Sequence, residues 1–169
     1  MTVAAGYNLT SSDGTTAQFA LGTETEIKGT KFGYFIADGT IAAYSACTIQ
    51  NDLDAEEATT TTSGAKPTLV CIPQFAVADN EYFWAPIGPI APSTPYNDPV
   101  TGAPTTFKVL AATLCATSVK LYTTGTDGVV DDTATDLIAG LFLTSTNSAG
   151  GTVATACQAA QRLVTNCQD

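Results

Sequence analysis

The sequence predicts an all-β protein, a single-domain β-sandwich or small β-barrel of jelly-roll-like form with long loops and an N-terminal arm. Three observations lead to this prediction. Short apolar segments alternate with a period of two and are separated by turns rich in Gly, Asn and Asp. Charged residues make up only 13% of the 169-residue chain, whereas Thr, a β-branched residue that suits exposed strand faces, is abundant. The length is enough for one domain with its own apolar core.

The first 16 residues are polar and rich in Thr, Ser and Gly, and they predict a flexible or docking arm. If fully extended, this arm could reach about 50 Å. We expect residues 17–169 to form the single β domain. Its first strand candidate is Ala17–Leu21.

The dipeptide Asp38-Gly39 is the strongest short hairpin signal in the chain. It lies between two apolar runs, Lys31–Ala37 and Thr40–Gln50, which we expect to pair as neighbouring strands. The segment that follows, Asn51–Gly64, is rich in Asp, Glu and Thr and predicts a mobile polar loop.

A second hairpin is predicted from two further apolar runs, Leu69–Ala78 and Glu81–Ile87, which are joined by Asp79-Asn80. Asp and Asn tolerate left-handed backbone angles and can bond their own backbone, so they suit a tight turn. The second run carries the largest apolar load in the chain, and we expect the rest of the fold to be arranged around it.

The aromatic residues of this run are the main candidates for an interface. Strand alternation places Tyr82 and Trp84 on one face and Phe83 on the other, so one face must lie in solvent, under a loop or against a neighbouring subunit. Trp and Tyr are common interface anchors. Core packing and a sugar-binding platform are the alternatives. The interface candidates are Tyr82, Phe83, Trp84, Tyr96 and Tyr7.

The C-terminal half begins with a proline-rich loop over residues 88–106. Its prolines are Pro89, Pro92, Pro95, Pro99 and Pro104, which exclude a helix there. The strands expected after it are Phe107–Ala112, Val119–Thr123, Val129–Val130 and Leu137–Thr144. The last segment, Val153–Cys167, fits a helix with an alanine-rich face or a strand. We favour the strand, because its Thr, Val and Cys content is high and everything before it is β.

The residues needed for common catalytic sites are missing or scattered. The chain has no His, which excludes Ser-His-Asp and Cys-His arrangements and removes the usual acid–base group near neutral pH. The carboxylate pairs are Asp52/Asp54, Glu56/Glu57 and Asp131/Asp132, all expected in solvated loops. Asp127, Asp131 and Asp132 could hold Ca²⁺, but their spacing matches no EF-hand loop. We therefore predict no catalytic residue, no cofactor and no metal.

Five cysteines lack CxxC spacing and are expected to be free thiols that act as small hydrophobic residues. They are Cys47, Cys71, Cys115, Cys157 and Cys167. The net charge of −10 disfavours nucleic acid and anionic membranes as partners. The sequence has no apolar run long enough to span a membrane and no basic, apolar start of a secretory signal, so we expect synthesis in the cytoplasm.

Three blocks together resemble small capsid decoration proteins of tailed phages, also called cement or head-stabilising proteins. The blocks are Phe32–Ile49, Gln74–Gly88 and Val119–Thr144. The resemblance implies a structural virion protein, synthesised in the host cytoplasm and bound to the outer surface of a shell made of an HK97-like major capsid protein. It also implies a homotrimer and no catalytic residues. The alternative is another virion or surface module, such as a head-fibre base or a glycan-binding β-sandwich.

Overall fold

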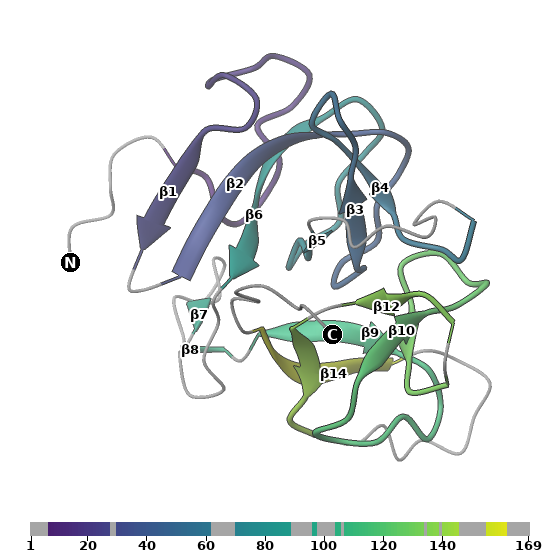
Figure 1. Cartoon of the computed structure of the whole chain (residues 1–169). Coiled ribbons are helices and arrows are strands. Elements are labelled where there is room, and N and C mark those ends of the chain that lie inside the picture. Colours follow the sequence, from purple (N-terminus) through teal and green to yellow (C-terminus); the bar gives the residue numbers. More distant parts are fainter. Residues whose placement is uncertain are drawn as a thin grey trace.

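The computed structural model describes residues 7–27, 30–61, 70–88, 107–133, 135–138 and 140–145, together with the backbone of the short strands at 96–97, 104–105 and 155–161. All regular secondary structure in these ranges is β-strand, and no helix occurs among them (Figure 1). The predicted all-β class is therefore confirmed.

The first sheet contains six of the described strands, and β2 is its centre. Its strands are β1 Glu24–Ile27, β2 Thr30–Ala37, β3 Cys47–Ile49, β4 Asp54–Glu57, β5 Val70–Cys71 and β6 Tyr82–Gly88. The order is β1-β2-β4-β3-β5, and β6 also pairs with β2. β1 pairs with the beginning of β2, and β4 runs parallel to its last two residues. The sheet curls into a half-barrel, so that β5 returns toward β6 (Figure 1). The amide of Ile72, directly after β5, donates to the Pro86 carbonyl of β6 at 3.4 Å.

The second sheet also contains six strands, in the order β12-β10-β11-β9-β14-β13. They are β9 Lys108–Ala111, β10 Leu121–Thr123, β11 Val130–Asp131, β12 Leu137–Ile138, β13 Leu141–Leu143 and β14 Thr155–Gln161. β11 lies parallel to β9, and the other neighbours are antiparallel. A separate pair, β7 Tyr96–Asn97 and β8 Pro104–Thr105, lies within the expected proline-rich loop. The other residues of that loop, apart from Gly88, lie outside the described residues.

Two apolar cores position the sheets. One fills the curl of the first sheet and includes Phe35, Phe83 and the thiols of Cys47 and Cys71. The other lies between the sheets, because Ile72 of the first half of the chain packs with residues of the second sheet. Burying such side chains provides the main driving force for folding.

Hydrogen bonds also join the two sheets. The Ala46 amide donates to the Gly128 carbonyl, and the Leu110 amide donates to the Tyr44 carbonyl, both at 2.9 Å. The side-chain amide of Gln74 brackets the peptide unit of Lys108. Its Nε2 donates to the Lys108 carbonyl, and its Oε1 accepts from the Lys108 amide, both at 3.0 Å. The edge of β9 that faces the first sheet is therefore closed by a side chain.

The predicted hairpin around Asp38-Gly39 is wrong. β2 does not pair with the segment that follows; it pairs with β6, β1 and β4. Gly39 has a φ of 92°, and its amide donates to Asp79 Oδ1 at 2.9 Å. The chain therefore turns toward the segment before β6, where Ile41 forms a bridge with Val77. A long-range pairing replaces the local one.

Two other N-terminal predictions need correction. Ala17–Leu21 forms bends and a turn, and the first strand is β1 instead. The expected mobile loop at Asn51–Gly64 contains β4, whose Ala55 is fully buried while the flanking carboxylates are partly exposed. β4 is a strand because it pairs with β2 and β3, although Asp and Glu have low strand propensity.

The turn at Asp79-Asn80 is confirmed, but its flanking strands do not form the expected hairpin. Asn80 is left-handed with a φ of 60°, and the Glu81 amide donates to the Ala78 carbonyl at 3.2 Å. β6 pairs with β2, whereas β5 pairs with β3. The turn depends on the local chemistry of Asp79 and Asn80. The strand partners depend instead on packing between segments that are distant in the sequence.

The C-terminal strand predictions are largely confirmed. The apolar run Leu137–Thr144 divides into β12 and β13, which are separated by a left-handed Gly140 with a φ of 80°. For Val153–Cys167, the described part is strand β14, which pairs with β9 and β13, so the strand is the correct alternative there. The rest of that segment lies outside the described residues.

Candidate functional site

An aromatic cluster covers the outer face of β2 and β6. Its members are Phe32, Tyr34, Trp84, Tyr7, Phe19 and Tyr82. Tyr34 and Trp84 are directly paired across the two strands, and both are fully buried. The ring centroid of Trp84 lies 5.0 Å from that of Tyr7 and 5.2 Å from that of Phe19, both edge-to-face. Such offset contacts stabilise beyond the burial of area alone.

The N-terminal segment, residues 7–23, supplies the cover over this cluster. The Asp13 amide donates to the Tyr82 carbonyl at 2.7 Å, and the Tyr82 amide donates to the Gly14 carbonyl at 2.9 Å. The Gln18 amide donates to the Tyr34 hydroxyl at 3.0 Å. Burial is the main reason that the pKa of Tyr34 lies above its ordinary value. The segment is thus held by backbone and side-chain bonds as well as by its aromatic rings.

The expectation of a flexible or docking arm needs correction for residues 7–16. These residues pack on the chain's own sheet, because Tyr7 and Leu9 provide apolar anchors within an otherwise polar stretch. Residues 1–6 of the expected arm lie outside the described residues.

The structure separates the interface candidates into different environments. Phe83 points into the core of the first sheet, 6.2 Å from Phe35 between ring centroids, and Trp84 lies beneath the N-terminal segment. The predicted alternation of Tyr82, Phe83 and Trp84 between faces is confirmed. Trp84 is fully buried within a cluster of the chain itself, as the core-packing alternative predicted. Tyr82 and Tyr7 are partly exposed, and an interface role for them stays a prediction. The side chain of Tyr96 lies outside the described residues.

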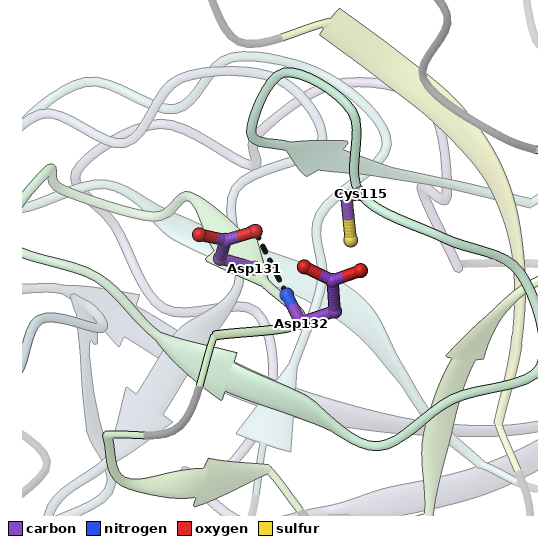
Figure 2. A group of neighbouring side chains, drawn as sticks. All are labelled: Cys115, Asp131 and Asp132. Carbon is purple, nitrogen blue, oxygen red and sulfur yellow. Dashed lines mark hydrogen bonds between the residues drawn. The ribbon is translucent and has the colours of Figure 1, made fainter.

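Cys115, Asp131 and Asp132 form a group of possible metal ligands (Figure 2). One donor atom from each residue lies within 4.8 Å of the others, and the Cys115 side chain is buried while both carboxylates are partly exposed. A thiolate with two carboxylates could hold a divalent cation such as Zn²⁺. The sequence reasoning paired Asp131 and Asp132 with Asp127. It missed Cys115, which only the fold brings to this place.

Both carboxylates in this group already have structural roles. Asp132 Oδ2 accepts from the Ala116 amide at 2.9 Å. Asp131 Oδ1 accepts from the Asp132 amide at 2.8 Å (Figure 2). The first bond holds a loop in which Leu114 and Ser118 adopt left-handed φ values of 66° and 61°. Because non-glycine residues rarely adopt this conformation, the loop needs such support.

An acidic cluster lies around β4. Burial is the first cause that raises the pKa of Asp54, and the charges of Asp52 and Asp38 raise it further. Burial and then the charge of Asp38 raise the pKa of Glu56, against the lowering effect of a hydrogen bond from Gln50. The ionised form of both carboxyls is therefore disfavoured in the fold. The expectation that these pairs lie in loops is wrong for Asp54 and Glu56, which are strand residues, although both side chains are partly exposed.

Three of the cysteines, Cys47, Cys71 and Cys115, are free and buried, which agrees with the expectation of free thiols. The side chains of Cys157 and Cys167 lie outside the described residues.

No protein family, no curated protein and no solved structure matches this chain. Within the described ranges, no helix is long and apolar enough to cross a membrane.

Proposed function

We propose that the protein is a structural virion protein that binds the outer surface of an HK97-like phage capsid. It stabilises the shell as a homotrimer that bridges neighbouring major capsid subunits. It is synthesised in the host cytoplasm and has no enzymatic role. In this role the chain supplies a rigid scaffold with loops that contact the shell.

The observation that carries this proposal is where the resembling blocks lie in the fold. Phe32–Ile49 contains most of β2, and Gln74–Gly88 contains β6. The two strands pair from Lys31, opposite Gly88, to Ile36, opposite Tyr82. Val119–Thr144 contains β10, β11, β12 and β13. The stretches that resemble decoration proteins therefore form the framework of both sheets rather than peripheral loops. A resemblance that reflects a shared fold should lie in such strands.

The chemistry of the chain supports the same proposal. The net charge of −10 favours solubility before docking and repels packaged DNA. The aromatic residues that could form a glycan-binding platform include Phe83 and Trp84, and both are fully buried. This burial favours shell decoration over the glycan-binding alternative.

The test is co-sedimentation of the purified protein with heads of the source phage that have been washed free of it. We expect binding to expanded, DNA-filled heads but not to compact proheads, together with a higher temperature of DNA release from the decorated heads. The free protein should sediment with three times the chain mass of 17.3 kDa. Absence of binding to either form of head would overturn the proposal.

A further inference from the structure

Two buried thiols face each other across neighbouring strands of the first sheet. β3 and β5 are antiparallel, and their register pairs Cys47 directly with Cys71. Both residues are 0% exposed, and both belong to the core inside the curled sheet. Their side chains therefore point to the same side of the sheet, as directly opposed residues must.

The backbone spacing of this pair suits a covalent bond. Directly opposed residues of antiparallel strands have Cα atoms about 4.5–5.5 Å apart, and a disulfide requires about 4.4–6.8 Å. The Cys71 side chain lies within hydrogen-bonding reach of the Cys47 thiol. Cys47 Sγ also lies 3.6 Å from the Ser45 carbonyl oxygen, to which it donates. Little backbone movement is needed to join the two sulfur atoms.

We propose that Cys47 and Cys71 are a redox modification site, at which a reversible cross-strand disulfide joins β3 to β5. The oxidant is a low-molecular-weight disulfide such as glutathione disulfide. This inference does not depend on the proposed role in the capsid, because it follows from the strand register alone.

The reaction is a pair of thiol–disulfide exchanges. One cysteine thiolate attacks a sulfur of glutathione disulfide, which forms a mixed disulfide and expels one glutathione thiolate. The second cysteine thiolate then attacks the protein sulfur of the mixed disulfide and expels the second glutathione thiolate. The two protons from the cysteines end on the two glutathione molecules. The protein thus loses two protons and two electrons, and glutathione disulfide gains them.

The structure also controls the rate of this reaction. Neither sulfur is exposed, so the first exchange requires local opening of the sheet. β5 is two residues long and pairs with β3 at only Cys71 and Val70, which makes its release less costly than unfolding of the whole sheet. Burial raises the pKa of Cys47 well above its ordinary value, with further contributions from Cys71 and Glu57. We therefore expect slow oxidation at neutral pH and faster oxidation in mildly alkaline buffer.

The disulfide should strengthen the first sheet. It closes the chain between residues 47 and 71, which restricts the unfolded state more than the folded state. The oxidised protein should have a higher melting temperature than the reduced protein, and a thiol reductant such as dithiothreitol should reverse the difference.

The test treats fully reduced, full-length protein with glutathione disulfide at about pH 8.5, within the titration range of cysteine thiols. One sample stays native, and another is refolded from guanidinium in a glutathione redox buffer. We expect loss of two of the five thiols, an intact mass lower by two hydrogens, and a linked Cys47–Cys71 peptide after digestion. Cys115→Ala, which changes another buried thiol, should keep this reaction, whereas Cys71→Ala should lose it.

The peptide map of the wild-type protein decides the outcome even if Cys71→Ala fails to fold. A Cys47–Cys71 link in either sample supports the proposal. Retention of all five thiols in both samples, or links that involve only the other cysteines, would overturn it.

Discussion

Replacement of Trp84 by Ala tests whether the aromatic cluster holds the fold together. Trp84 is fully buried, and its ring centroid lies within 5.2 Å of those of Tyr7, Phe19 and Tyr34. Substitution of a buried Trp by Ala costs about 3–5 kcal/mol. The three aromatic pairs add about 0.5–1.5 kcal/mol each to the burial of area, and this contribution is already part of that range. The N-terminal segment also loses its main anchor, so we expect a loss near the upper end, about 4 kcal/mol.

Urea unfolding followed by far-UV circular dichroism measures this loss, because the variant no longer contains the only Trp of the chain. The first control is Trp84→Phe, which keeps an aromatic ring and removes an Nε1 that has no hydrogen-bond partner among the described residues. It should cost less than half as much. The second control is Leu114→Ala, since Leu114 is 73% exposed and its truncation should change stability by about 0.5 kcal/mol or less.

If Trp84→Ala lowers the free energy of unfolding by less than about 1 kcal/mol, and the slope of this free energy against urea concentration is unchanged, a core role for this residue is refuted. Sedimentation of the same variant separates a second possibility. If the variant folds normally but its oligomer dissociates, Trp84 contacts a neighbouring subunit, and the N-terminal segment must move away from Trp84 when the oligomer forms.

The remaining predictions concern the N-terminal segment, the acidic cluster and the Cys115 loop. The double substitution Tyr7→Ala and Phe19→Ala should uncover Trp84, so its fluorescence maximum should shift to longer wavelength; an unshifted spectrum would contradict the cover. The raised pKa of Asp54 means that the folded state binds its proton more tightly than the unfolded state, so this group lowers stability as pH rises from its ordinary value of 3.8 through the raised one. Asp54→Asn should therefore stabilise the protein by about 0.5 kcal/mol at pH 7 in low salt, and the gain should vanish near pH 3 or in 1 M salt, as thermal melts can show. Asp132→Ala removes the acceptor of the Ala116 amide and should cost about 1–3 kcal/mol in urea unfolding, whereas Asp132→Asn should recover most of this loss.

The sequence predicted the features that depend on neighbouring residues. The alternation of Tyr82, Phe83 and Trp84 fixed which side chain lies on which face of β6, and the left-handed tolerance of Asn80 fixed the turn before it. Both follow from local backbone geometry. The all-β class followed in the same way from many such short segments.

The features that could not be predicted depend on contacts between distant parts of the chain. Gly39 directs the chain toward Val77 instead of back along β2, because that segment offers a bridge partner and Asp79 accepts the Gly39 amide. Ala55 is buried by the parallel pairing of β4 with β2, which outweighs the low strand propensity of its acidic neighbours. Cys115 approaches Asp132 because β11 pairs in parallel with β9, and no sequence spacing encodes that pairing.

The contact between Gln74 and Lys108 has a consequence for self-association. A strand edge with free amides and carbonyls is a template on which another chain can add as a further strand, and proteins with exposed edges tend to aggregate. Gln74 presents one acceptor and one donor to the Lys108 peptide unit, and it thus imitates one residue of a neighbouring strand. Lys108 itself places its ammonium group 5.6 Å from the ring centre of Tyr44, so a charge stands beside the same edge. β9 lies between β11 and β14, but β11 pairs with it only at Ala111, so the Lys108 end has one side without a strand partner. The amide that joins the two sheets therefore also covers this end of β9 against the addition of a second molecule.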